Sequence, residues 1–379
     1  MISCNKTSKF TKKNYLHILF LLVAGLFLIW QLIPDGAWFG SETDWYSQHM
    51  TIADYMRKNF YATGQLFPDF TGLGGGTNFF SLSYYGFMRP DVLLSYFFPS
   101  VPVAYFLQGY AIFEILLGCT LLYYWLHQKR ISDFTVLVCS FFYLCANCMF
   151  QSHRQIMFVN YLPFALMALI CLDRIFSTSK MENHKIRPHA GLVLSLFLFI
   201  LHSFYFFPSC FVAGILYICV LLGEQKEQQP DKNWKKIRKK IWWNYILDVS
   251  IAVSMTLFFL LPTGLAILGN KKDVGNSTSL FKILAVNPTL DSILYSPYGC
   301  GLTLFCLYAL FLAIREKKTR KLAITVFVLL FFDIFYWILN ATLYVRPKCM
   351  IPFLPLILYL TALVLDGLCQ KKIRHSLPL

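Results

Sequence analysis

The chain has 379 residues, of which 57% are hydrophobic, 18% aromatic and only 14% charged. Soluble globular domains carry about 25% charged residues, so this composition excludes an ordinary soluble protein. Apolar stretches of about 15 to 25 residues recur along the sequence. Together they predict an all-α polytopic membrane protein that forms a single membrane domain over residues 1–379.

The net charge of +15 raises the question of a nucleic-acid partner. If the N-terminus is cytoplasmic, however, 25 of the 34 Lys and Arg residues fall in the segments predicted on the inside. This asymmetry is the positive-inside pattern, which predicts membrane topology and excludes a nucleic-acid role. We therefore expect a multi-pass protein of the cell membrane with both termini cytoplasmic and membrane lipid as a partner. The predicted inside segments are 1–14, 127–133, 174–189, 224–241, 315–321 and 369–379.

The first predicted span covers residues 15–33. Lysines precede it, and no small-residue cleavage site follows it, so the pattern favours a retained helix over a removed signal peptide. The next segment, residues 34–102, is far longer than any other predicted connection. It is rich in aromatic residues, which are rare in disordered chains, so we predict an ordered extracellular loop.

Within this loop, the stretch GSETDWYSQHMTIADYMRKNF at 40–60 predicts a helix from about residue 42 to residue 60. Ser41 and Asp44 have the spacing of a capping pair at its start. The spacing places Asp44, Gln48 and Thr51 on one face. We expect the helix to lie along the outer membrane surface with its apolar side toward the lipid.

A glycine-rich stretch, GLGGGTNFFSLSYYG, follows at 72–86. Its glycines permit backbone geometries that bring main-chain amides close to a ligand. No Lys-Ser or Lys-Thr pair follows in a strand-to-helix context, so a nucleotide-binding P-loop is not predicted.

Nine further spans are predicted over residues 103–368, followed by a cytoplasmic tail at 369–379. Three of them, at 134–150, 190–204 and 208–223, are short enough to be broken or re-entrant. Carboxylates inside spans are costly and usually face a cavity or a partner, which draws attention to Glu114, Asp248 and Asp333. The other predicted spans are 103–126, 157–176, 242–266, 299–314, 322–340 and 350–368.

The sequence resembles the bacterial YfhO family of membrane proteins and, more broadly, the GT-C type of membrane glycosyltransferase. The resemblance rests on DWYSQ, in which Asp44 and Gln48 match an Asp-x-x-x-Gln pattern. It also rests on GLGGGTNFFSLSYYGFMRPDVLL at 72–94 and on the layout of residues 134–176. The first half of the chain carries this likeness, and the second half matches only in hydropathy.

The resemblance implies an enzyme that takes a sugar from a polyprenyl-phosphate carrier. The expected acceptor is a cell-envelope polymer of the teichoic-acid kind on the outer face of the membrane. Such enzymes commonly place an acidic residue in the first outer loop as catalytic base, and Asp44 is the matching position. Two readings of Asp44 are open: a base partly desolvated at the membrane boundary, or a simple helix cap.

Sugar transfer also needs groups that bind the donor. Gln48, one turn from Asp44, is expected to orient the carboxylate or bind a sugar hydroxyl. Cations must steady the phosphate leaving group, and Arg154, Arg346 and Arg89 are candidates among the few on the outer side. Asn78, Tyr84 and Tyr85 are also predicted to bind substrate. The rings of the two tyrosines can stack on a sugar or line a lipid groove. The outer-side cations considered are Arg57, Lys58, Arg89, Arg154, Lys271, Lys272, Lys282, Arg346 and Lys348.

The cofactor is unknown from sequence. No set of metal ligands is assigned, although a divalent cation shared by Asp44 with Asp54, Asp69 or Asp91 remains open. Two other functions are alternatives to an enzyme. One is a transporter or flippase for a lipid-linked saccharide, with Glu114, Asp248 and Asp333 along its path, and the other is a non-catalytic membrane scaffold.

Overall fold

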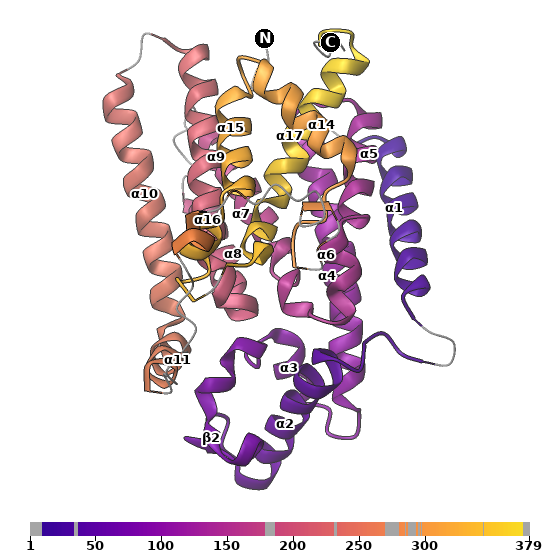
Figure 1. Cartoon of the computed structure of the whole chain (residues 1–379), viewed down its shortest axis with the longest axis vertical. Coiled ribbons are helices and arrows are strands. Elements are labelled where there is room, and N and C mark those ends of the chain that lie inside the picture. Colours follow the sequence, from indigo (N-terminus) through magenta and orange to yellow (C-terminus); the bar gives the residue numbers. More distant parts are fainter. Residues whose placement is uncertain are drawn as a thin grey trace.

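The computed structural model describes residues 10–33, 37–178, 186–230, 233–269, 280–284, 286, 293–294, 296, 298–343 and 345–373. Most of its helices run along one axis and form an elongated body, and the outer segment forms a separate layer at one end (Figure 1). The connections between α9 and α10 and between α14 and α15 lie at the opposite end (Figure 1).

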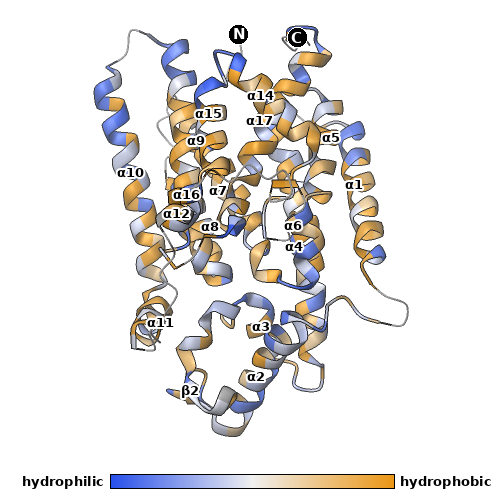
Figure 2. Cartoon of the chain, viewed as in Figure 1, coloured by the Kyte–Doolittle hydropathy of each residue, from blue (hydrophilic) through white to orange (hydrophobic). Residues whose placement is uncertain are grey.

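Ten of the described helices run along the body and are apolar over much of their length. An apolar run becomes helical in a membrane because lipid offers no hydrogen-bond partners to the backbone. Figure 2 shows the resulting apolar surface along the middle of the body. These helices are α1 (Lys12–Gln31), α4 (Val103–Gln128), α5 (Asp133–Leu144), α7 (Leu162–Thr178), α8 (Ile186–Ser203), α9 (Phe207–Gln228), α10 (Trp234–Met255), α14 (Leu304–Arg315), α15 (Arg320–Phe331) and α17 (Leu354–Cys369).

Shorter helices connect or extend these elements. They are α6 (Asn147–Phe150), η4 (Gln151–His153), η5 (Ile156–Phe158), η7 (Phe204–Phe206), α11 (Leu257–Gly269), α12 (Leu280–Leu284), α16 (Asp333–Leu339) and η8 (Pro347–Phe353). The 3-10 helix η8 leads directly into α17, the most central helix of the body together with α7.

By length and composition, the described residues contain five helices able to cross a membrane, or up to seven if each bent pair counts as one span. The prediction of a multi-pass, all-α protein is therefore confirmed, and the prediction of ten spans is not. The short span at 134–150 is broken as expected, with a bend of 46° between α5 and the α6 region.

The predicted continuous span at 242–266 is wrong, because α10 and α11 meet at an angle of 75°. Thr256 lies at this break. Its hydroxyl donates to the carbonyl oxygen of Val253 at 2.8 Å, a back-bonding contact that bends helices. Pro262 lies inside α11 and cannot donate a backbone hydrogen bond there.

The outer segment contains a helix, a short hairpin and two further helical turns. Its elements are the π-helix η1 (Trp45–Met50), α2 (Thr51–Thr63), β1 (Phe70–Thr71), η2 (Leu73–Gly75), β2 (Thr77–Asn78), η3 (Phe79–Tyr85) and α3 (Pro90–Ser95). The two strands pair antiparallel, with Phe70 opposite Asn78. The helix predicted at about 42–60 is thus present, but it begins with a π-helical turn and continues to Thr63.

A shared apolar cluster joins the outer segment to the body. Ile52 and Met56 of α2 pack with Phe79 and with Phe87, and the same buried cluster contains residues from the end of α8 and the start of α11. The apolar side of α2 therefore faces protein. This packing accounts for the aromatic richness of the segment, because these rings form the interface on which it is held.

Candidate functional site

Asp44 immediately precedes the π-helix η1, at the junction of the outer segment and the body. Its carboxylate is partly buried, and its side chain does not cap the helix. Ser41 does not complete a cap either, since its hydroxyl lies 2.8 Å from the hydroxyl of Thr43. The carboxylate makes no hydrogen bond or ion pair within the described part of the chain, so it is free to act on a ligand.

Arg154 approaches Asp44 from the body. It follows η4, and its Nε donates to Oγ1 of Thr43, the residue before Asp44, at 3.4 Å. The guanidinium is exposed. An exposed guanidinium near a partly buried carboxylate provides one positive and one negative group at the same edge of the junction.

Tyr85 forms the other side of the Asp44 environment. Burial raises the pKa of its phenol above the ordinary value, and the negative charge of Asp44 raises it further. Tyr85 therefore stays protonated and remains a hydrogen-bond donor near the carboxylate. Its neighbour Tyr84 lies with its ring centroid 5.6 Å away and faces a second group of residues.

Lys348 is the centre of that second group. Only 6% of this residue is exposed, and its Nζ donates to the hydroxyl of Tyr84 at 2.9 Å. The ammonium also lies 4.4 Å from the ring centroid of Tyr205 and 5.3 Å from that of Phe158. Such contacts with aromatic faces stabilise a buried cation.

Arg346 enters the same group from the residue before η8. Its guanidinium carbon lies 5.3 Å from the ring centroid of Tyr298, and the side chain is exposed. Asn340 fixes the backbone here, because its amide donates to the Arg346 carbonyl oxygen at 2.8 Å and its oxygen accepts from the Tyr205 hydroxyl at 2.6 Å.

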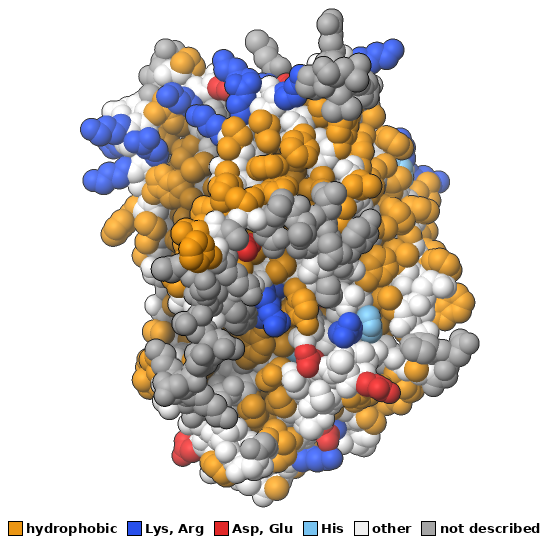
Figure 3. Space-filling view, viewed as in Figure 1, with side chains coloured by type: hydrophobic (Ala, Val, Ile, Leu, Met, Phe, Trp, Pro, Cys, Tyr) orange, Lys and Arg blue, Asp and Glu red, His pale blue; other side chains and the backbone are white. Residues whose placement is uncertain are grey.

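We call the set Asp44, Tyr84, Tyr85, Arg154, Arg346 and Lys348 the junction site. It combines an unpaired carboxylate, three cations and two tyrosines drawn from four distant parts of the chain. Figure 3 shows basic and acidic side chains gathered on this face, between the apolar surface of the body and the outer segment. A π-helical turn such as η1 is often associated with functional positions.

Three other predicted residues lie differently. Gln48 is partly buried on η1 and its side chain makes no hydrogen bond within the described residues. Asn78 is exposed on β2, where its side chain accepts from the backbone of Phe80 and caps η3. Arg89 is only 2% exposed and binds both carboxylate oxygens of Asp91, at 3.0 and 2.7 Å. Arg89 therefore stabilises the outer segment through this buried ion pair, and its side chain is not exposed to a ligand at the surface.

The buried position of Lys348 and its contact with Tyr84 were not predicted from the sequence. Lys348 appeared there as one of nine outer-side cations, with no feature that set it apart. The available signal was its position two residues after Arg346 and directly before the long apolar run that begins at Cys349. An ionisable residue in that context is a candidate functional residue.

Two of the other outer carboxylates have cationic partners of their own. Asp54 binds Lys58 at 2.6 Å and Asp91 binds Arg89. Among the residues that the structure describes, no group of three His, Cys, Asp or Glu side chains is placed to hold a metal ion. A divalent cation shared with Asp54 or Asp91 therefore has no support in these contacts.

His49 lies on η1 between Trp45 and Tyr85 and is 3% exposed. Burial, with the charge of Arg89 nearby, lowers its pKa from 6.5 to about 3. Between these values the unfolded chain binds a proton that the folded chain does not. The free energy of unfolding should therefore fall as the pH is lowered through this range, by up to about 1.4 kcal/mol per pH unit.

We expect the variant His49→Phe to show a weaker loss of stability between about pH 6.5 and about pH 5, because it lacks this titration. Unfolding of the detergent-solubilised protein, followed at several pH values, measures the slope. An unchanged slope in the variant would show that His49 does not contribute it.

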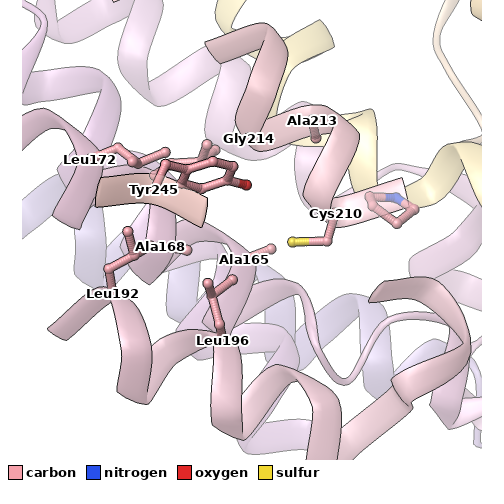
Figure 4. Close-up of a pocket in the computed structure, with 11 residues that line it drawn as sticks. Ala165, Ala168, Leu172, Leu192, Leu196, Cys210, Ala213, Gly214 and Tyr245 are labelled. Atoms are coloured by element: carbon pink, nitrogen blue, oxygen red, sulfur yellow. The ribbon is translucent and has the colours of Figure 1, made fainter. Parts of the chain in front are cut away.

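A small apolar cavity lies elsewhere in the body, among α7, α8, α9 and α10 (Figure 4). Its volume is only about 20 Å³, and it is partly open to its surroundings. Gly214 is required at its wall, because a Cβ there would lie 2.2 Å from the Tyr245 hydroxyl oxygen. None of its lining residues comes from the outer segment, so the cavity is separate from the junction site.

Comparison with known proteins gives one match. A family model described as bacterial membrane protein YfhO matches residues 16–344, which is most of the chain. No curated protein and no solved structure matches the chain. The matched region includes Asp44, Tyr84, Tyr85 and Arg154 of the junction site, and it ends just before Arg346. The chain belongs to the YfhO family of bacterial membrane proteins.

Proposed function

We propose that this protein is a membrane glycosyltransferase of the GT-C type. Its donor is a sugar carried on polyprenyl phosphate, and its acceptor is a hydroxyl of a cell-envelope polymer of the teichoic-acid kind. The outer segment faces the outside of the cell in this proposal. Its support is that basic side chains of α10 and of the α14–α15 connection gather at the opposite end of the body, as the positive-inside rule requires (Figure 3).

The observation that carries the proposal is the Asp44 carboxylate, which is partly buried, does not cap the helix and is unpaired within the described residues, and which follows the residue that Arg154 contacts. A carboxylate that served only to cap η1 would bind the backbone amides at the helix start, and Asp44 does not. A free acid next to groups suited to phosphate is the arrangement that acceptor activation needs.

In the proposed reaction, the acceptor hydroxyl oxygen attacks the anomeric carbon of the donor sugar. The bond from that carbon to the phosphate oxygen breaks, and its electron pair leaves with the polyprenyl phosphate. Asp44 takes the proton of the hydroxyl. Arg154, Arg346 and Lys348 stabilise the negative charge that grows on the leaving phosphate.

The aromatic residues complete the proposed site. Tyr84 and Tyr85 present rings on which a sugar can stack, and the protonated Tyr85 phenol can donate to a ligand near Asp44. Arg89 has a positioning role, because its pairing with Asp91 fixes the segment that follows these tyrosines. Gln48 is one helical turn from Asp44 and remains a candidate for orienting a ligand hydroxyl.

The contacts favour this proposal over a transport path. Glu114 lies 3.1 Å from His202, and Asp248 lies 2.6 Å from His189. The two histidines occupy opposite ends of α8, about 20 Å apart at the helical rise of 1.5 Å per residue. The two carboxylates thus lie beside different histidines at different depths, and these contacts do not join them into one pathway.

The direct test supplies purified protein in lipid vesicles with a polyprenyl-phosphate-linked sugar and a teichoic-acid-type polymer. We expect the sugar to appear on the polymer and free polyprenyl phosphate to appear in equal amount. Movement of the intact lipid-linked sugar between leaflets, with no transfer to the polymer, would contradict the proposal and favour a flippase.

Replacing Lys348 with methionine tests donor binding. The substitution removes a charge-assisted contact with the phosphate and should lower kcat/KM for the donor by about tenfold to a hundredfold. The matched control is Tyr84→Phe, which removes the partner hydroxyl of Lys348 but leaves its charge. An equal loss in both variants would assign Lys348 to holding Tyr84, and not to the phosphate. Initial rates over a range of donor concentrations measure the effect.

A further inference from the structure

A second cavity lies at the opposite end of the molecule from the junction site, between the end of α9 and the start of α10. It has a volume of about 340 Å³ and is partly open to its surroundings. Ligand sites in proteins commonly occupy volumes of this order. The lining consists of Leu222, Gly223, Lys226, Trp234, Lys235 and Arg238, and we call it the α9–α10 cavity.

Three cations line this cavity without a protein anion. Lys226, Lys235 and Arg238 are exposed, and none of them makes an ion pair or side-chain hydrogen bond within the described part of the chain. Lys129, by contrast, is paired with Asp173 at 2.6 Å. Three uncompensated positive charges around one cavity create a strong local attraction for an anion.

The acidic residues next to this cavity do not neutralise it. Glu224 accepts a hydrogen bond from Tyr359 at 3.4 Å, on the side facing α17. Glu227 is exposed and makes no ion pair within the described residues. The cavity therefore presents a net positive rim.

The remaining lining is apolar and well anchored. The Trp234 indole donates to the carbonyl oxygen of Gln229 at 2.9 Å, which fixes the ring at the start of α10. Leu222 and Gly223 form the apolar part of the wall. Figure 2 shows that α10 changes from a hydrophilic start, where the cavity lies, to an apolar lower half.

We propose that the α9–α10 cavity binds the phosphate headgroup of an anionic membrane phospholipid. The three cations contact the phosphate, and the acyl chains leave along Leu222 and the apolar part of α10. A cationic rim above an apolar wall matches a phospholipid better than free phosphate, because free phosphate gains nothing from the wall. This site is independent of the junction site and of the proposed transfer reaction.

The test compares lipid binding by the full-length protein and two triple variants in detergent. The first, Lys226→Gln with Lys235→Gln and Arg238→Gln, removes the cations that line the cavity. The control, Lys236→Gln with Lys239→Gln and Lys240→Gln, removes the same charge from the same basic stretch, at exposed positions outside the cavity lining. Binding of phosphatidylglycerol and of phosphatidylcholine is measured by native mass spectrometry during titration.

We expect the unmodified protein and the control variant to bind phosphatidylglycerol at least about tenfold more tightly than phosphatidylcholine. The cavity variant should lose this preference, while its thermal unfolding stays the same because the replaced side chains are exposed. Millimolar inorganic phosphate should leave the lipid bound. Equal loss in both variants would overturn the proposal in favour of general attraction to the basic segment. Displacement by phosphate would overturn it in favour of a free-anion site.

Discussion

The Asp44→Asn variant should transfer sugar about 10² to 10⁴ times more slowly than the unmodified protein, because general-base catalysis contributes a factor of this size. Asparagine has nearly the same shape and cannot accept the proton of the acceptor hydroxyl. The loss should appear in kcat with little change in KM for the donor, since the cations that bind the phosphate remain in place. Single-turnover transfer from the polyprenyl-phosphate donor measures the chemical step.

The matched control is Asp69→Asn, which makes the same change at an exposed carboxylate of the same outer segment. Its activity should remain close to that of the unmodified protein. The capping interpretation predicts a different pattern, in which Asp44→Asn is harmless because asparagine caps helices as well as aspartate does. Full turnover by Asp44→Asn would therefore remove the base from the proposed mechanism and leave Asp44 a local structural residue.

The Arg89→Met variant should be destabilised by about 3 to 5 kcal/mol, because it leaves the buried Asp91 carboxylate without its partner. Both side chains are almost fully buried, so water cannot replace the lost contacts. Arg89 also lies near the buried Glu114 on α4, and its removal leaves a second carboxylate without a neighbouring positive charge. Thermal and denaturant unfolding of the detergent-solubilised protein measure the loss.

The double variant Arg89→Met with Asp91→Leu separates pairing from packing. Replacing both members of a buried ion pair by apolar residues is often close to neutral, so we expect this variant to recover most of the lost stability. Its activity should recover as well if Arg89 only positions the outer segment. A stable double variant that transfers sugar as slowly as the single variant would instead give the Arg89 guanidinium a direct part in substrate binding.

The local pattern of the sequence predicted the outer helix well. The spacing of Ile52 and Met56 gave α2 an apolar side, and Gly64 ends the helix in the left-handed conformation that favours glycine. The surface that this side covers was predicted wrongly as lipid. The periodicity of a helix identifies its apolar face, but lipid and protein are equally apolar, so the pattern cannot distinguish them.

The predicted count of ten membrane spans is not confirmed, for a related reason. Mean hydropathy over a window of residues does not detect a bend in the helix. Residues 242–266 were therefore predicted as one span, although the chain turns by 75° at Thr256. The region at 322–340 is likewise divided, with α15 ending at Phe331 and α16 beginning at Asp333. Hydroxyl groups and local packing decide where a long apolar run breaks.

The sequence by itself determined that this chain is a multi-pass helical membrane protein with an ordered outer segment, because apolar length, charge asymmetry and aromatic content are properties of single segments. It also identified Asp44 as a carboxylate just beyond the first span. Only the tertiary structure decided which cations meet it. Arg89 and Lys348 are both basic residues of the predicted outer side. Arg89 is paired with Asp91, two residues away, whereas Lys348 donates to Tyr84, which lies 264 positions away in the sequence. Partners so far apart along the chain are chosen by the packing of helices, and no local pattern records that choice.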